Sequence, residues 1–263
     1  MIKAVLCGAL GRMGKSILET AEEDPEVDII GGVEHPDCIK DRDLGKASGI
    51  SSYSGKPLTS RLEELIGSCD IIIEFSGNTQ AAAGHAKLAS ASGKGIVIGT
   101  TGFSERELEQ IKECANSIPL LLSPNMSIGI NLLFKLIEVA VNVLKDKGFD
   151  IEIMEIHHKF KKDAPSGTAV KMFEIIKGLT EKEACFGRKG IHERKEEEVG
   201  IFALRGGDVV GDHTVYFLGT GERIELTHRA TSRKTFAKGT IEAVKWLKNK
   251  KPGLYSMFDV LGI

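Results

Sequence analysis

The chain begins, after Met1, with Ile2-Lys3-Ala4-Val5-Leu6-Cys7-Gly8-Ala9-Leu10-Gly11-Arg12-Met13-Gly14. Its first part is a short apolar run, which fits a strand buried in a parallel sheet. After the glycines, apolar residues recur with helical spacing at Met13, Ile17, Leu18 and Ala21. The glycine pattern is G-x-x-G-x-x-G, a variant of the dinucleotide-binding G-x-G-x-x-G, and it stands between a strand and a helix, where that pattern has its meaning. This stretch predicts a dinucleotide-binding unit.

A second expected strand, residues 27–33, ends at an acidic residue. Glu34 stands 20 residues after Gly14, a distance at which a carboxylate can accept hydrogen bonds from the adenosine ribose. Glu34 alone could be only a surface acid, but the strand, glycines and helix before it favour ribose binding. The carboxylate repels a 2′-phosphate, whereas a cationic His35 beside it could tolerate one. The sequence therefore predicts NADH or NADPH as cofactor, with NADH favoured.

Short apolar strands alternate with helices as far as Leu122, which is the doubly wound pattern. Strands are expected at 70–75, 95–98 and 119–122, helices at 62–66, 79–91 and 105–116, and a loop excursion at 36–60. Because ligands of such sheets bind at the carboxyl ends of the strands, the polar turns there should line one crevice. These turns contain Gly99, Thr100 and Thr101, and then Ser123, Pro124, Asn125 and Met126. The alternative is that they only cap the next helices.

The second half has a different pattern. A long apolar helix is expected at 128–144, followed by strands of alternating polar and apolar residues at 149–156, 199–205, 213–218 and 223–228. Glycine-rich turns at 206–208 and 219–222 favour hairpins, and the charged segment 182–198 favours a solvated loop. We expect an N-terminal doubly wound Rossmann domain (1–127) and a C-terminal α+β substrate domain (128–235) with a mostly antiparallel, four-stranded open sheet. A last helix and an extended tail (236–263) should pack back on the first domain.

One face of that second sheet could promote self-association. Val215, Phe217, Ile224 and Leu226 could form an open apolar face that joins copies of the chain, or they could be part of the chain's own core.

One segment combines imidazoles, cations and a small-residue turn: Glu155-Ile156-His157-His158-Lys159-Phe160-Lys161-Lys162-Asp163-Ala164-Pro165-Ser166-Gly167-Thr168-Ala169. Adjacent histidines on a strand face opposite ways, so one can carry protons while the other contacts a substrate. Clustered cations attract anions, although a lysine run on a loop is more often a solvated surface.

The turn at the end of this segment opens an expected helix. Asp163 or Ser166 can cap that helix, and the amides of Gly167 and Thr168 at its N-terminus can hold a carboxylate. Arg233, before the last helix, could hold a second carboxylate through two hydrogen bonds. Two such groups predict a small dicarboxylate substrate.

Bulk properties exclude several classes of protein. The chain has 263 residues and a net charge of −2, so no basic excess favours nucleic acid or an anionic membrane. Its five cysteines form no C-x-x-C pair, which favours the reducing cytoplasm over a disulfide framework. No apolar run approaches the roughly 20 residues of a membrane helix, no signal peptide is expected, and no metal site is predicted.

These motifs closely resemble those of the 4-hydroxy-tetrahydrodipicolinate reductase (dihydrodipicolinate reductase) family over nearly the whole chain. The most specific is Glu-x-His-His-x-x-Lys-x-Asp-x-Pro-Ser-Gly-Thr-Ala at 155–169. The resemblance implies NAD(P)H-dependent reduction of 4-hydroxy-tetrahydrodipicolinate, a cyclic dicarboxylate, to tetrahydrodipicolinate with loss of water, in lysine and diaminopimelate biosynthesis. It also implies a homotetramer joined through the second-domain sheets, and a hinge.

The resemblance also assigns residues. His157 is implied as proton donor and acceptor and Lys161 as proton donor. Substrate binding is implied for His158, Ser166, Gly167, Thr168 and Arg233. Cofactor binding is implied for Gly8, Ala9, Leu10, Gly11, Arg12, Met13, Glu34, Gly99, Thr100, Thr101, Ser123, Pro124, Asn125 and Met126. Many members carry Arg where this chain has His35, which puts a strong preference for NADPH in doubt.

Two other functions stay open from the sequence. The first is another two-domain dehydrogenase, such as one acting on a semialdehyde; the acylating type needs a nucleophilic cysteine, for which no cysteine here stands in a distinctive context, but homoserine-type chemistry does not. The second is a non-catalytic, cofactor-sensing module, which would not need His157 or Lys161.

Overall fold

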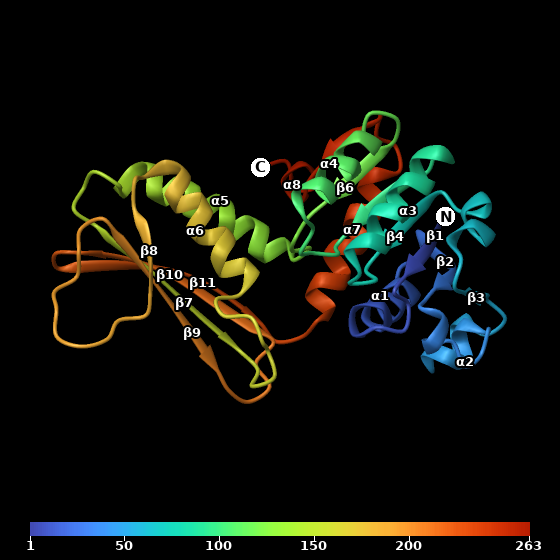
Figure 1. Cartoon of the computed structure of the whole chain (residues 1–263), viewed down its shortest axis with the longest axis horizontal. Coiled ribbons are helices and arrows are strands. Elements are labelled where there is room, and N and C mark those ends of the chain that lie inside the picture. The colour runs from blue at the N-terminus through green and yellow to red at the C-terminus, as the bar shows by residue number, and fades with distance from the viewer. The chain divides into compact units, whose positions relative to one another are not determined.

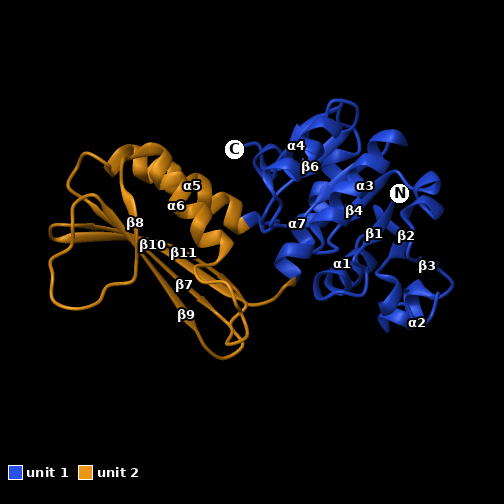
Figure 2. Ribbon diagram, in the orientation of Figure 1, with its two compact units in different colours: residues 1–128, 234–263 blue, residues 129–233 orange.

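The computed structural model describes residues 1–263, which form two compact units (Figures 1 and 2). Unit 1 contains Met1–Ile128 and Lys234–Ile263, and unit 2 contains Gly129–Arg233. The chain therefore leaves unit 1 once, builds unit 2, and returns to complete unit 1.

A seven-stranded parallel sheet forms the centre of unit 1. Its strands are β1 (Ile2–Cys7), β2 (Val27–Val33), β3 (Leu58–Thr59), β4 (Ile71–Glu74), β5 (Gly95–Ile98), β6 (Pro119–Leu122) and β12 (Gly253–Tyr255). They lie in the order β12-β6-β5-β4-β1-β2-β3, so the chain builds outward from β1 in one direction and then, from β4, in the other. The carboxyl ends of β1 and β4 are therefore the switch point at which such sheets bind ligands.

Helices cover both faces of this sheet, which explains why its strands are apolar without alternation. On one face α1 (Arg12–Glu22) packs with α7 (Lys234–Leu247), and on the other α3 (Thr79–Ala91) packs with α4 (Glu105–Cys114). Side chains of β4 alternate between the two faces of the sheet: Ile71 and Ile73 lie in the hydrophobic core that includes α1 and α7, and Ile72 lies in the core that includes α3 and α4. Ser104 forms a capping box of α4 with Glu107.

Three segments of unit 1 differ from the sequence predictions. Residues 36–60 are not only a loop: they form η1 (Pro36–Cys38), α2 (Leu44–Ser48), η2 (Ser51–Tyr53) and β3. Leu44, Tyr53 and Leu58 are buried in the core there, isolated apolar residues that show no helical or strand period. Residues 62–68 form two 3₁₀ turns, η3 (Leu62–Glu64) and η4 (Ile66–Ser68), and the tail forms β12 and α8 (Met257–Leu261).

Unit 2 contains a mixed sheet of five strands, which corrects the prediction of four mostly antiparallel ones. The strands are β7 (Asp150–His157), β8 (Glu183–Phe186), β9 (Glu198–Arg205), β10 (Gly211–Gly219) and β11 (Glu222–Ala230), in the order β11-β10-β7-β9-β8. The β10–β11 hairpin is present. The expected hairpin at 206–208 is wrong, because β7 lies between β9 and β10 and pairs with β9 in parallel. A glycine turn permits a hairpin but does not set strand order.

The charged segment 182–198 is only in part a solvated loop: residues 187–197 form a mostly exposed loop, whereas residues 183–186 form a strand. It contains β8, and its arginines form ion pairs with the sheet: Arg188 binds both carboxylate oxygens of Glu152 at 2.7 Å, and Arg194 binds Glu152 at 3.0 Å. Arg188 also pairs with Glu198 at 2.7 Å. Glu152 is only 8% exposed, so these arginines compensate a carboxylate that the fold removes from water.

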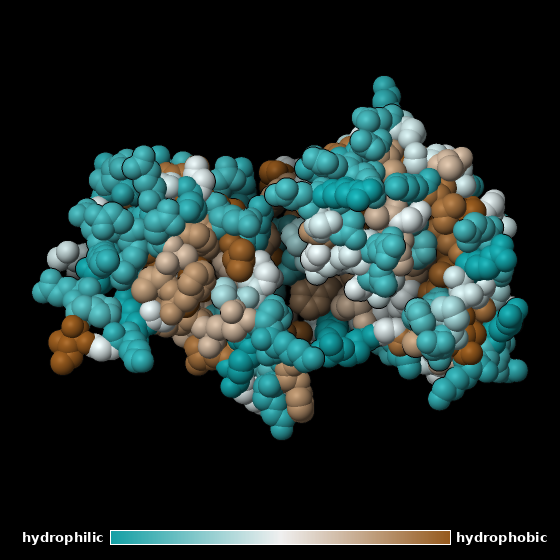
Figure 3. Space-filling view, in the orientation of Figure 1, coloured by the Kyte–Doolittle hydropathy of each residue, from teal (hydrophilic) through white to brown (hydrophobic).

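The helices α5 (Ile128–Leu144) and α6 (Gly167–Leu179) lie together over one face of the sheet (Figure 1). Val215 and Phe217 are fully buried within the single chain, so they belong to its core, whereas Ile224 is 39% exposed. Figure 3 shows mostly hydrophilic side chains on the visible side of unit 2, with a hydrophobic area among them. Exposed apolar residues on α5 include Leu132, Leu136, Val139 and Val143. None of the helices combines the length and the apolar character needed to cross a membrane.

Candidate active site

The glycine turn of unit 1 is packed so closely that larger residues do not fit. Gly8 has a φ of +79°, and a Cβ on it would lie 2.4 Å from the carbonyl oxygen of Phe75. A Cβ on Gly14 would lie 2.1 Å from the carbonyl oxygen of Gly8. The turn therefore lies directly against the first turn of α1, whose amide groups can face an anion. These contacts fit the pyrophosphate of a dinucleotide.

Glu34 lies beside this turn at the carboxyl end of β2. Its carboxylate accepts hydrogen bonds from the amides of Leu10 and His35, each at 2.9 Å. The side chain of His35 accepts a hydrogen bond from the amide of Asp37 and lies 3.6 Å from that residue's carboxylate. Glu34 is thus fixed to the glycine turn, while His35 is held toward the exposed start of η1.

A buried carboxylate joins the turns that follow β4 and β5. Glu74 is fully buried and accepts hydrogen bonds from the amide of Ser76 at 2.7 Å and the hydroxyl of Thr100 at 3.2 Å. It also pairs with His85 of α3. Burial opposes ionisation, but the hydrogen bonds, first of all that from His85, lower the pKa of Glu74. Thr100 in turn accepts from the amide of Gly77 at 3.2 Å.

The turn after β5 does not cap the helix that follows it. The cap of α4 is Ser104, so residues 99–101 do not cap that helix; Gly99 instead leaves space for the Phe75 ring, 2.2 Å from where its Cβ would be. After β6, the Ser123 hydroxyl donates to the carbonyl of Asn125 at 2.8 Å, and Met126 is buried. Both predicted turns therefore lie at the carboxyl edge of the sheet with the glycine turn.

In unit 2, one fully buried carboxylate organises the motif segment. Glu155 and His157 lie on the same side of β7, and Oε2 of Glu155 is 2.6 Å from Nδ1 of His157. Arg205 of β9 binds both oxygens of Glu155 at 2.8 Å. Burial opposes ionisation of Glu155, yet the hydrogen bonds from His157, Arg205 and the Ser166 amide lower its pKa to about 2.

The start of α6 is tied to the same carboxylate. Ser166, not Asp163, is the N-cap, and its hydroxyl accepts from the amide of Ala169. The Ser166 amide donates to Glu155 at 2.9 Å, and its hydroxyl lies 3.1 Å from Nε2 of His213. Gly167 and Thr168 follow in the first turn of the helix, the end at which the helix dipole favours an anion. This end of α6 can hold a carboxylate.

The remaining predicted residues occupy less constrained positions. His158 follows the last residue of β7, and its amide donates to the carbonyl of Val209 at 2.8 Å. Lys161 forms an ion pair with Asp163 at 3.0 Å, with its side chain 22% exposed. Arg233 is the half-buried last residue of unit 2, next to the start of α7. The structure brings His157, His158, Lys161 and the Ser166–Thr168 turn into one unit.

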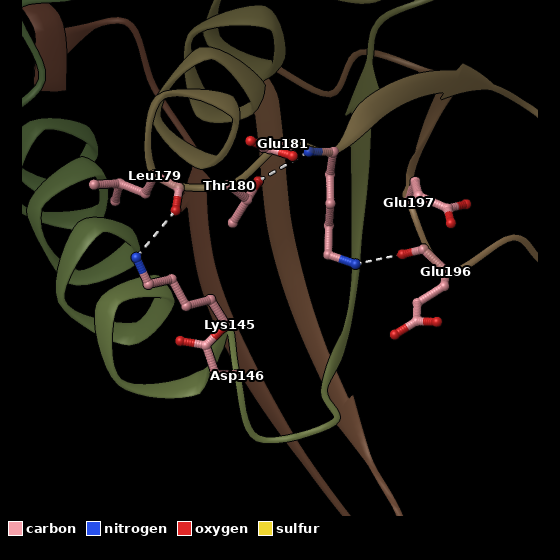
Figure 4. A pocket seen from close by; sticks show the side chains of 8 residues that line it. Lys145, Asp146, Leu179, Thr180, Glu181, Glu196 and Glu197 are labelled. Carbon is pink, nitrogen blue, oxygen red and sulfur yellow. Dashed lines mark hydrogen bonds between the residues drawn. The ribbon is translucent and has the colours of Figure 1, made fainter.

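A different pocket of unit 2 does not fit catalysis. It has a volume of about 550 Å³ and is lined by residues that include Lys145, Leu179, Lys182 and Glu196 (Figure 4). It lies at the C-terminal end of α6, about 20 Å along the helix from Gly167. Its lysines donate hydrogen bonds to main-chain carbonyl groups, Lys145 to Leu179 and Lys182 to Glu196, and no histidine or cysteine lines it.

Sequence reasoning did not single out Glu74, Arg205 or His213. Glu74 stands inside an apolar strand, where a buried carboxylate needs a partner, and that signal could have found it. Its partner His85, like the Arg205 partner of Glu155, comes from another element of the chain, and no spacing rule points to either.

Two family models match nearly the whole chain. The model described as dihydrodipicolinate reductase, N-terminus, matches residues 2–126, and the model described as dihydrodipicolinate reductase, C-terminus, matches residues 129–261. The chain is 65% identical to the 4-hydroxy-tetrahydrodipicolinate reductase of Aquifex aeolicus, covering 100% of this chain and 99% of that protein. It is 44% identical to the enzyme of the same name from Methanocaldococcus jannaschii, covering 100% and 98%.

Solved structures show the same architecture. A dipicolinate-bound dihydrodipicolinate reductase from Paenisporosarcina sp. TG-14 superposes with a TM-score of 0.80 at 26% identity, over 98% of both chains. A scyllo-inositol dehydrogenase from Lactobacillus casei with bound NAD(H) and scyllo-inositol has a TM-score of 0.60 at 14% identity, covering 99% of this chain and 93% of its own, which is a likeness of fold alone.

Proposed function

The chain belongs to the dihydrodipicolinate reductase family of NAD(P)H-dependent oxidoreductases, and we propose that it reduces (2S,4S)-4-hydroxy-2,3,4,5-tetrahydrodipicolinate to (S)-2,3,4,5-tetrahydrodipicolinate with loss of water. The reaction belongs to lysine and diaminopimelate biosynthesis. The observation that carries the proposal is the pairing of His157 with a buried carboxylate directly beside the N-terminus of α6. That arrangement joins a proton carrier to a carboxylate-binding group.

Unit 1 is the cofactor-binding domain in this proposal. The turn at Gly8–Met13 receives the pyrophosphate, Glu34 the adenosine ribose, and the turns at 99–101 and 123–126 the nicotinamide side. NADH or NADPH, when bound, supplies the hydride that adds to ring C4 of the substrate. Glu34 favours NADH, and the exposed His35 permits some use of NADPH. Comparing kcat/KM for the two cofactors measures this preference, and a hundredfold preference for NADPH would contradict it.

Unit 2 binds the substrate in this proposal. The amides of Gly167 and Thr168, with the turn at Ser166, hold one carboxylate, and His158 and Arg233 contribute further contacts to the dicarboxylate. His157 and Lys161 supply the proton that balances the hydride. Both side chains lie within the segment that Glu155 and Ser166 fix, so they reach a substrate held at that helix end.

The competing functions have less support. An acylating dehydrogenase needs an activated thiol, but burial raises the pKa of Cys7, Cys69 and Cys114 and so keeps them protonated. A cofactor-sensing module has no use for a buried carboxylate that orients a histidine outside the cofactor unit. Homoserine-type chemistry does not match the family to which the chain belongs.

The decisive experiment is a coupled assay that follows the absorbance of NADH while hydroxy-tetrahydrodipicolinate is generated fresh in the cuvette. We expect turnover that depends on the generated substrate. A well-folded protein that binds NADH but shows no turnover with this compound would reject the proposed function.

His157→Ala should lower kcat by on the order of 10²-fold or more, with a smaller change in KM, because a general acid acts mainly in the transition state. The same assay measures it. His192→Ala, which changes an exposed histidine of unit 2, is the matched control and should keep the full rate. An unchanged kcat in the His157 variant would mean that the proton comes from another group.

We also propose that the chain works as a homotetramer in the cytoplasm. Exposed apolar residues on α5 and on the strands β8 and β9, such as Phe186 and Leu204, favour association of unit 2 with other copies. All five cysteines are free thiols, as expected for a reducing compartment. Light scattering coupled to size exclusion gives the oligomeric mass directly.

A further inference from the structure

The carboxylate of Glu155 is surrounded by hydrogen-bond donors. Arg205 donates to Oε1 and to Oε2 at 2.8 Å, and the amide of Ser166 donates to Oε1 at 2.9 Å. The guanidinium of Arg205 and the amide N–H of Ser166 only donate and cannot accept a hydrogen bond. The remaining neighbour is Nδ1 of His157, at 2.6 Å from Oε2. Glu155 is fully buried, so its charge is compensated by these partners alone.

This arrangement leaves one choice of tautomer for His157. An ionised carboxylate only accepts hydrogen bonds, so Nδ1 of His157 must carry the proton that faces Glu155. Nε2 is then the ring atom that can take up or release a proton. Other charged and titratable groups near the ring include Arg205 on β9, bound to the same carboxylate, and His213 on β10, whose ring centroid lies 5.0 Å from that of His157; Lys161 also interacts electrostatically with His213.

The side of the ring that carries Nε2 is kept open by a small residue. A Cβ on Gly211, in β10, would lie 3.0 Å from Nε2 of His157, closer than an ordinary contact. A larger residue there would therefore press on the atom that exchanges protons, whereas glycine does not.

We propose that Glu155, clamped by Arg205, is a positioning residue that fixes His157 as the Nδ1–H tautomer and reserves Nε2 for proton exchange during the reduction. This inference rests on the proposed function in naming the reaction, but the tautomer itself can be measured without it. The same carboxylate binds the Ser166 amide, so it also fixes the start of α6, and with it the turn that holds the substrate carboxylate, relative to His157.

The first test needs no substrate. Nitrogen-15 NMR of the histidine rings in the ligand-free full-length protein distinguishes a protonated from an unprotonated ring nitrogen, and His157→Asn identifies the His157 signals by their loss. We expect neutral His157 to carry its proton on Nδ1. A wild-type protein with the proton on Nε2 would overturn the proposal.

The second test uses Glu155→Gln. The Gln oxygen should turn toward the donors on Oε1, namely Arg205 and the Ser166 amide, which leaves the Gln NH₂ facing Nδ1 of His157. His157 should then switch to the Nε2–H tautomer, and kcat should fall by about 10²-fold, as for loss of a general acid, while KM changes less than threefold. Glu155→Asp keeps the charge and should recover part of the lost kcat.

The structure offers a matched control on the same strand. Glu152 is also buried and also bound by two arginines, but it does not contact His157. Glu152→Gln should lower the free energy of unfolding. It should leave the tautomer of His157 unchanged and keep kcat within about twofold of wild type. An equal loss of kcat in the Glu152 variant, or an unchanged tautomer in Glu155→Gln, would overturn the proposal. If the tautomer switches but the wild type does not turn over hydroxy-tetrahydrodipicolinate, the proposed function fails and the positioning role of Glu155 stands.

Discussion

His213 is a buried histidine that the fold keeps uncharged. It is 4% exposed, Nδ1 has no hydrogen-bond partner, and Nε2 faces the Ser166 hydroxyl. Burial is the main cause that lowers its pKa to about 3, and the nearby His157 adds to the effect. The unfolded chain binds a proton near pH 6.5, so protonation favours unfolding below that pH.

The pH dependence of stability follows from this difference. The contribution of His213 is complete above about pH 6.5 and is lost as the pH falls toward 3. Between pH 7 and pH 5 the free energy of unfolding should fall by about 2 kcal/mol from this residue. His213→Gln, whose side chain does not titrate, should remove that part of the slope in urea unfolding curves. His192→Gln on the surface should keep it; equal slopes in wild type and the His213 variant would contradict the argument.

At the scale of single residues, the sequence pointed to the candidate site residues that belong to one motif. It missed those that come together only in the folded chain. His157 and the Ser166–Thr168 turn belong to one segment, so their proximity follows from chain connectivity. Arg205 reaches Glu155 only because β9 pairs with β7 in parallel. The periodicity of apolar residues does not show that β9 pairs with β7, so Arg205 could not be predicted as the partner of the Glu155 carboxylate.

At the scale of helices and turns, the contact between the glycine turn and α1 gives the most direct test of the proposed cofactor site. Gly14→Ala places a methyl group against main-chain atoms of Gly8 and Ala9, which cannot move aside as a side chain can. The turn should open, weakening NADH binding at least tenfold, and the free energy of unfolding should fall by about 1–3 kcal/mol. Fluorescence titration and denaturant unfolding measure the two effects.

Gly84→Ala is the control for that substitution. Gly84 lies within α3 and has no atom within 4 Å of the position of an added Cβ. Alanine should stabilise the helix by about 0.5–1 kcal/mol and leave NADH binding unchanged. If both variants bound NADH equally well, the packing of the glycine turn would not govern the cofactor site.

The long helices and the buried parallel strands were predicted well, but the short helix expected at 62–66 and the irregular segments were not. Strands β1, β2, β5 and β6 lie where their apolar runs predicted them, because burial on both faces leaves an unambiguous signal. The short β8, β3 and β12 carry no such signal. They exist because an edge of a formed sheet accepts a few residues of extended chain, a tertiary effect.

At the scale of the whole molecule, two separate stretches of sequence, Met1–Ile128 and Lys234–Ile263, form one compact unit 1. The Ser127 hydroxyl lies 3.4 Å from that of Thr235, where the chain leaves and re-enters the unit. A chain in which residues 129–233 are replaced by a short Gly/Ser linker should therefore fold and bind NADH within tenfold of the full-length affinity, without reductase activity. Circular dichroism and NADH titration test this.

The control is residues 1–128 alone. That fragment lacks α7, whose Ala237, Val244 and Leu247 are fully buried in the core of unit 1. It should be unfolded and bind no NADH. Binding by this fragment, or none by the linked chain, would show that unit 1 is not closed by α7.

Because α7 lies near the end of the sequence, it also determines the order in which the two units can be completed during synthesis. The ribosome makes β1 to β6 first, but the core that contains Ile17 and Leu18 of α1 stays incomplete until α7 emerges. Roughly 100 residues of unit 2 are translated in between, which at 5–20 residues per second takes about 5–20 s. Unit 2 is therefore translated in full before α7 can complete the core of unit 1.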